Sequence, residues 1–154
     1  MFGPEGFFLP SLLEYAGTLS LVNAMSLRVM IVDDHKGFRS ALRLILSTDP
    51  DIEVVAEAED GVDAVARAGE ALPDIVCMDV SMPRMNGIEA TRELLSARPA
   101  VKVIGLSAYA EAHFVREMAS AGAVGYVVKG DAGQNLLPAI RAVANQLTYF
   151  SAEE

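Results

Sequence analysis

The alternation of short apolar runs with longer amphipathic segments is the feature that most constrains this chain. It begins at Leu27 and continues through five rounds to about residue 146. Apolar, β-branched runs separated by helical patterns predict βαβ units and therefore a parallel sheet. The predicted strands are 27–32, 52–58, 75–78, 101–106 and 124–128, and the predicted helices are about 38–46, 61–71, 88–95, 111–121 and 134–146.

The near-continuous apolar character of these runs predicts a sheet that is covered by helices on both faces. Short connections and right-handed crossovers then indicate a doubly wound α/β fold. Two strand orders are known for such sheets, and both stay open on pattern alone. Five strands favour the shorter order, 2-1-3-4-5.

The length of 154 residues suits one compact domain. We assign residues 27–146 to this domain, residues 1–26 to an N-terminal extension, and residues 147–154 to a C-terminal tail or the start of a linker. Met25 directly precedes the first patterned segment, which favours a disordered upstream extension. The alternative is an amphipathic helix over residues 11–25 that docks on a partner or on the domain.

The composition excludes several classes of function. A net charge of -9 opposes direct binding to nucleic acid or to an anionic membrane, because both need clustered Lys and Arg. Pro10 and Gly17 interrupt the apolar N-terminal stretch, so no run spans a bilayer. The single cysteine, Cys77, lies in an apolar run and reads as a buried hydrophobe. We therefore expect a cytoplasmic protein without a membrane segment.

Polar side chains stand where the predicted strands end, which is where ligands bind in open parallel sheets. The second run ends in Glu59 and Asp60, at the expected edge of the sheet. The other four runs end in Asp33 and Asp34, in Asp79, in Ser107 and in Lys129.

This set of side chains predicts a site where a carboxylate accepts a phosphoryl group. Three carboxylates at one edge raise each other's pKa unless a cation lies among them, and hard oxygen ligands suit Mg2+. Lys129 can pair with one phosphoryl oxygen, and Ser107 can donate a hydrogen bond to another. Asp79 stands alone at the end of the central strand and is the natural nucleophile, whereas the adjacent Asp33 and Asp34 are better placed to hold the ion.

Five segments of the chain, in this order, resemble the receiver domain of two-component response regulators. They are VMIVDDH at 29–35, MDVSMP at 78–83, NG at 86–87, LSA at 106–108 and GYVVK at 125–129. The resemblance covers Leu27 to roughly Gln146 and implies a flavodoxin-like, CheY-like fold. The Asp-Asp-His segment and the last helix most resemble the NarL/FixJ-like branch, which usually carries a helix-turn-helix output domain. We expect no such domain within these 154 residues.

The resemblance implies a role for each matching residue at the metal. Asp79 would be the phosphoacceptor and a metal ligand. Asp34 would bind Mg2+ directly, Asp33 would bind it mostly through water, and the backbone carbonyl of Ser81 would complete the protein ligands.

The resemblance also implies a switch. Ser107 and Lys129 would contact the phosphoryl group. When Ser107 moves toward that group, Tyr126 would turn inward. The phosphoryl group would come from a sensor histidine kinase, and the chain would catalyse only its own phosphorylation and dephosphorylation. Phosphorylation is expected to change assembly, through a homodimer that uses either the first and fifth helices or the face formed by the fourth helix, fifth strand and fifth helix. The output would be transcription control through a domain outside these residues. Three alternatives stay open: a truncated chain, a stand-alone receiver that acts by protein contact, and an output domain on another polypeptide.

Two other functions are weighed against this one. A phosphatase with an Asp nucleophile needs a second Asp two residues later as general acid, and that position is Ser81. A flavin carrier fits the fold, but the acidic site disfavours a flavin phosphate. His35 is expected to begin the first helix and to stay solvated or hydrogen-bonded, outside the site, and His113 is expected at the surface. Lys36, Gly37 and Gly130 depart from the family's usual residues.

Overall fold

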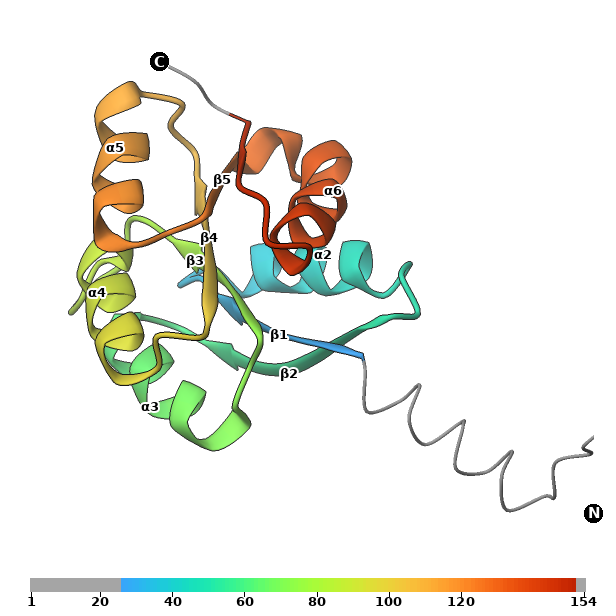
Figure 1. Cartoon of the computed structure of the whole chain (residues 1–154), viewed down its shortest axis with the longest axis horizontal. Helices are drawn as coiled ribbons and strands as arrows, with labels where there is room; N and C mark the ends of the chain where they lie inside the picture. The colour runs from blue at the N-terminus through green and yellow to red at the C-terminus, as the bar shows by residue number, and fades with distance from the viewer. Residues whose placement is uncertain (1–25, 152–154) are drawn as a thin grey trace, which may run out of the picture.

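The computed structural model describes residues 26–151, which form a six-stranded parallel sheet between two layers of helices (Figure 1). The strand order is β2-β1-β3-β4-β5-β6, which confirms the predicted doubly wound order 2-1-3-4-5. The strands are β1 (Leu27–Val32), β2 (Ile52–Ala58), β3 (Ile75–Asp79), β4 (Lys102–Ser107), β5 (Gly125–Val128) and β6 (Tyr149–Phe150). The helices are α2 (Lys36–Leu46), α3 (Gly61–Ala71), α4 (Gly87–Ala97), α5 (Ala112–Ala121), the short 3-10 helix η1 (Lys129–Asp131) and α6 (Ala132–Ala144).

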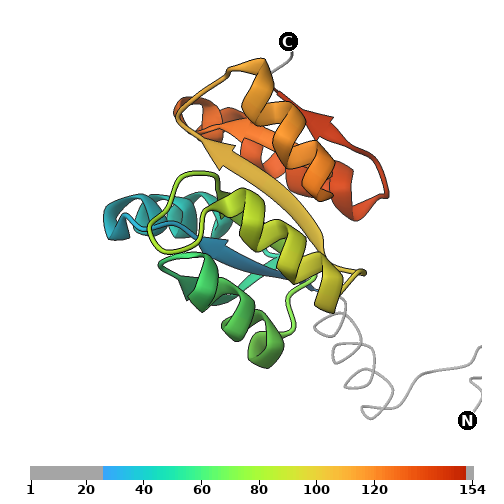
Figure 2. The same ribbon diagram turned by 90° about the vertical axis from the view of Figure 1, so that its left-hand side faces the viewer.

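Alternating side chains of the central strands build two separate cores. Figure 1 shows α2 and α6 on one face of the sheet, and Figure 2 looks onto the other face, where α3, α4 and α5 lie. In β1, Val29 and Ile31 pack with the α2 and α6 side, whereas Met30 and Val32 pack with the other side. All four are fully buried. The sheet therefore separates two apolar cores, and its polar side chains lie at the ends of the strands.

The sixth strand is the one addition to the predicted sheet. Tyr149 and Phe150 were assigned from sequence to a tail or linker, but they pair in parallel with Gly125 and Tyr126 of β5. The backbone N–H of Ser151 continues the ladder by donating to Tyr126 O at 2.9 Å. Two residues are too few to show an alternating pattern, so the sequence carries no readable signal for this strand.

The predicted extension, residues 1–26, lies outside the described residues except for Ser26. The same is true of residues 152–154 in the predicted tail. None of the helices between residues 26 and 151 combines the length and hydropathy that crossing a bilayer requires.

Candidate functional site

Parallel pairing brings the predicted acids to one edge of the sheet. Val32 of β1 pairs with Met78 of β3, so the next residues of the two strands, Asp33 and Asp79, lie side by side. Lys129 follows the end of β5 and reaches across: its Nζ lies 2.6 Å from Asp33 Oδ2 and 3.3 Å from Asp79 Oδ1. Three residues separated by 96 positions of sequence thus form one cluster, which we call the acid–lysine cluster (Asp33, Asp79 and Lys129).

Burial makes this cluster electrostatically unusual. Asp33 is fully buried and Asp79 is 3% exposed. Burial, and after it the charge of Asp33, raise the pKa of Asp79 from 3.8 to about 7, although Lys129 and the Ser81 N–H oppose the rise. For Lys129, burial alone would lower the pKa, but the carboxylates of Asp33 and Asp79 outweigh it, and the pKa is raised. The ammonium group stays charged beside a carboxylate that is easily neutralised.

Three further residues, Asp34, His35 and Ser81, lie at the solvent-exposed rim of the cluster. The side chain of Asp34 is 30% exposed and lies next to Asp33. The imidazole Nδ1 of His35 lies 3.4 Å from Asp33 Oδ1 and 3.3 Å from Asp34 Oδ1, with its side chain 73% exposed. His35 is also the N-cap of α2, as the sequence predicted. Ser81 is exposed, and its backbone N–H donates to Asp79 Oδ1 at 3.3 Å.

The donor set fits a hard divalent cation. Asp33 Oδ2 is buried, has the Lys129 ammonium as an ion-pair partner, and accepts no hydrogen bond of regular geometry. A buried carboxylate oxygen that accepts no regular hydrogen bond, next to an exposed carboxylate, can coordinate a cation. Carboxylate oxygens that keep access to water are the ligands that Mg2+ prefers. Asp33 and Asp34 would hold the ion next to Asp79.

Ser107 and Tyr126 are connected to each other through Tyr109 rather than through the carboxylates. Ser107 ends β4, is 2% exposed, and its Oγ accepts a hydrogen bond from the Tyr109 N–H at 3.0 Å. The Tyr126 ring is fully buried, and its hydroxyl donates to Tyr109 O at 2.7 Å. Within residues 26–151, Ser107 makes its hydrogen bond to the loop after β4 and not to Asp79. The inward orientation of Tyr126 is the one that the resemblance assigns to the switched state.

Two glycines let the loop after β3 close tightly around Asp79. A Cβ on Gly87, the first residue of α4, would lie 1.9 Å from Asp79 O. A Cβ on Gly61, the first residue of α3, would lie 2.5 Å from Met85 O. Asn86 caps α4 by accepting the N–H groups of Ile88 and Glu89. The loop can therefore run between two helix starts only because both helices begin with glycine.

Sequence reasoning missed the buried arginine that supports the first acidic residue. Arg39 is 9% exposed, its Nη1 donates to Asp33 O at 2.7 Å, and its Nε donates to Glu57 Oε1 at 2.9 Å. The signal was present, because Arg39 is spaced three and seven residues before Leu42 and Leu46, which face the core. A second missed contact is the ion pair of Asp60 with Arg84.

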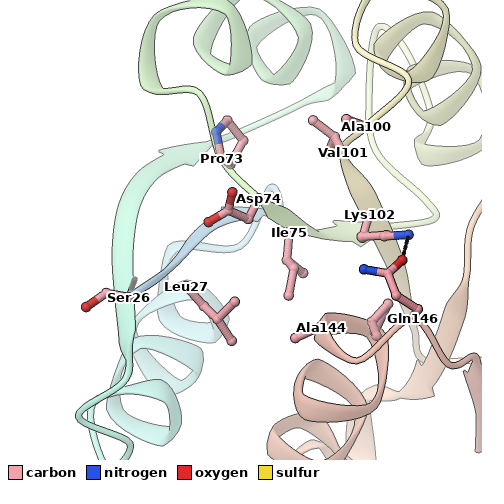
Figure 3. Close-up of a pocket in the computed structure, with 11 residues that line it drawn as sticks. Ser26, Leu27, Pro73, Asp74, Ile75, Ala100, Val101, Lys102, Ala144 and Gln146 are labelled. Atoms are coloured by element: carbon pink, nitrogen blue, oxygen red, sulfur yellow. Dashed lines mark hydrogen bonds between the residues drawn. The ribbon is translucent and has the colours of Figure 1, made fainter. Parts of the chain in front are cut away.

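A cavity of about 380 Å3 lies at the opposite end of the sheet, and it has a different character (Figure 3). Its walls come from the starts of strands and from the end of α6. Figure 3 shows the amino group of Lys102 bonded to the Gln146 side chain, at 2.9 Å. The Asp74 carboxylate accepts the Arg28 N–H at 2.9 Å. Its charged groups thus have partners, so the acid–lysine cluster is the stronger candidate for chemistry.

Comparison with known proteins identifies the family of this chain. Residues 29–141 match the family described as "Response regulator receiver domain". The chain belongs to this family. The identification confirms the resemblance stated from the motifs, and the receiver domain places Asp33, Asp79 and Lys129 at the ends of its strands.

The relatives of this receiver domain include transcriptional regulators. It is 39% identical over 129 residues to "Transcriptional regulatory protein DegU" of Brevibacillus brevis, which covers 84% of this chain and 55% of that protein. A crystal structure of a LuxR-family two-component response regulator from Aurantimonas sp. SI85-9A1 has a TM-score of 0.79 at 35% identity, covering 82% of this chain and 90% of that one. A CheX-CheY-BeF3-Mg+2 complex from Borrelia burgdorferi matches with a TM-score of 0.72 at 27% identity, covering 77% and 89%. The chain spans 55–62% of the length of the curated relatives it matches.

Proposed function

We propose that this receiver domain is a phosphorylation switch in which Asp79 accepts a phosphoryl group from a sensor histidine kinase. The observation that carries the proposal is the acid–lysine cluster: a buried carboxylate with a raised pKa, held 3.3 Å from an ammonium group whose pKa is also raised. A carboxylate that only stabilised the fold would be expected to have its charge satisfied. Asp79 instead stands beside another buried acid.

The residues of this chain orient the reaction. An Asp79 oxygen forms the new O–P bond while the P–N bond of the phosphohistidine breaks and its electron pair returns to the imidazole. Lys129 neutralises charge that develops on the phosphoryl oxygens, and Ser107 can donate its hydroxyl to one of them. When bound by Asp33, Asp34, Asp79 and the Ser81 carbonyl, Mg2+ would supply charge neutralisation. Its presence in the Borrelia burgdorferi complex supports that assignment.

The same contacts explain how a signal would leave the site. Ser107 and Tyr126 share the Tyr109 backbone as hydrogen-bond partner, so a phosphoryl group that engages Ser107 changes the bonds of the loop that Tyr126 holds. A local change in charge then alters the face formed by α5, β5 and α6.

The wider role follows from the same proposal. The domain would act in the cytoplasm, turn over only its own phosphoryl group, and form a homodimer when phosphorylated. Transcription would be controlled through an output domain, as the DegU relative's name supports. This domain itself would not bind nucleic acid.

The test is phosphoryl uptake from acetyl phosphate with Mg2+, followed by intact-protein mass. The wild type should gain one phosphoryl group, and Asp79→Asn should gain none. Asp74→Asn is the matched control, because Asp74 lies before the same strand at the opposite end of the sheet. Uptake by Asp79→Asn, or no uptake by the wild type, would refute the proposal.

A further inference from the structure

The loop after β3, residues 80–86, is fastened to α3 by an ion pair that takes no part in the chemistry. We propose that this pair, Asp60 with Arg84, positions the phosphoacceptor loop and thereby sets how fast Asp79 takes up phosphoryl and how tightly the site binds Mg2+. This inference rests on the proposed function of Asp79. Neither residue touches Asp79, so both are positioning residues.

The backbone of Arg84 is in an unusual conformation. Its φ is 65°, in the left-handed region that disfavours side chains other than glycine. Within residues 26–151 the other non-glycine residues with positive φ are Leu72 and Gln146, and both lie just past a helix C-terminus, where this conformation is ordinary. Arg84 lies between a strand and a helix. Such a conformation persists where the surrounding contacts hold it in place.

The side chain of Arg84 supplies those contacts. Its Nε donates to Asp60 Oδ2 at 2.8 Å, and its Nη2 contacts the same oxygen. The other oxygen of Asp60 accepts the Asp63 N–H at 2.9 Å and so caps α3. Asp60 is only 4% exposed. One oxygen of the Asp60 carboxylate thus caps the N-terminus of α3, and the other holds the loop through Arg84.

A backbone contact fastens the neighbouring loop residue to the same helix. The N–H of Gly61 donates to Met85 O at 3.1 Å. At the other end of the loop, the N–H of Ser81 donates to Asp79 Oδ1 at 3.3 Å. Only two residues lie between Ser81 and Arg84, so a shift of Arg84 is carried along the backbone to the carboxylate of Asp79. Small misplacements of reacting groups slow reactions strongly.

Four variants separate the ion pair from its alternatives. Arg84→Gly keeps the left-handed backbone but removes the guanidinium, and Asp60→Asn keeps the helix cap but removes the charge. Arg84→Lys restores a cation and should rescue part of the rate. Arg67→Ala is the matched control, because Arg67 pairs with Asp63 on the surface of α3 without reaching the loop.

The first measurement is the rate of phosphoryl uptake from acetyl phosphate, together with Mg2+ affinity. Arg84→Gly and Asp60→Asn should each lower both by about fivefold, whereas Arg67→Ala should leave both unchanged. Wild-type values in Arg84→Gly would overturn the inference, because the backbone conformation alone would then position the loop. An equal loss in Arg67→Ala would also overturn it, because general weakening of α3 would explain the result.

The second measurement is amide hydrogen exchange of the metal-free protein, which does not depend on phosphorylation. The amides of Ser81 and Met85, which donate to Asp79 Oδ1 and to Pro83 O, should exchange faster in Arg84→Gly and Asp60→Asn than in the wild type. Unchanged exchange would overturn the inference. If the wild type took up no phosphoryl, the proposed function would fail, and the exchange result would still decide whether the pair holds the loop.

Discussion

Two buried aspartates, Asp60 and Asp79, have surroundings that shift their pKa values in opposite directions. Asp60 follows the edge strand β2, and the Asp63 N–H, with help from Arg84, lowers its pKa. Asp79 ends the central strand β3, and burial with the nearby charge of Asp33 raises its pKa to about 7. Burial is similar at 4% and 3% exposure. At Asp60 the hydrogen-bond donors outweigh the effect of burial on the pKa, whereas at Asp79 burial and the charge of Asp33 outweigh Lys129 and the Ser81 N–H. That balance separates a structural carboxylate from a reactive one.

The largest expected contrast is between the cations beside the two aspartates. Lys129→Met should slow phosphoryl uptake by about 100-fold, because the ammonium that contacts Asp79 is lost. Arg84→Met should slow it far less, by about fivefold, because Arg84 reaches Asp79 only through the loop. Uptake rates from acetyl phosphate would measure both. Equal losses would erase the distinction between the two sites.

Substitution of Gly87, the first residue of α4, should affect stability differently from substitution of Gly133, a glycine within α6. Gly87→Ala should lower the free energy of unfolding by about 3 kcal/mol or more, because the new Cβ would lie 1.9 Å from Asp79 O. Gly133→Ala is the control: a Cβ there has nothing within 4 Å, so the variant should gain up to about 1 kcal/mol. Urea unfolding measures both. A mild effect of Gly87→Ala would show that α4 can move away from Asp79.

The pH dependence of stability should have opposite signs for the two aspartates. The folded-state pKa of Asp79 lies above its ordinary value of 3.8, so its contribution is favourable at low pH and is lost as pH rises toward about 7. The lowered pKa of Asp60 makes its contribution present above 3.8 and lost as pH falls below that value.

This difference can be isolated in metal-free protein by urea unfolding at pH 5 and pH 8. Asp79→Asn should gain on the order of 2 kcal/mol relative to the wild type at pH 8, and much less at pH 5. Asp74→Asn serves as the control, because Asp74 lies at the opposite end of the sheet from the acid–lysine cluster. An Asp79→Asn gain that is equal at both pH values would contradict the raised pKa.

The smallest contrast concerns the cap that Asp60 provides. Asp60→Ala should lower the free energy of unfolding by about 1–2 kcal/mol, because the Asp63 N–H loses its acceptor. Asp60→Asn keeps an acceptor and should lose less than about 1 kcal/mol. Thermal or urea unfolding compares them. If the two variants lose the same amount, the ion pair with Arg84 and not the cap stabilises this helix start.

Much of the site was predictable because the end of each strand can be recognised in the sequence. Asp33, Asp79, Ser107 and Lys129 each stand where an apolar run stops, and parallel strands carry such residues to one edge. Arg39 was legible from helical spacing and was overlooked. The role of Arg84 had no local sequence signal, because its partner Asp60 lies 24 residues earlier and no pattern in either segment indicates that the two residues pair.

The sequence by itself determined the doubly wound sheet and the edge where the acids meet, since both follow from periodicity and from where each period ends. Only the tertiary structure decided which acids are satisfied and which are not. That depends on donors brought in from elsewhere: the Asp63 N–H and Arg84 at Asp60, and Lys129 at both Asp33 and Asp79. Charge satisfaction is a property of three-dimensional neighbours, and so is the pairing of Tyr149 and Phe150 with the edge of β5.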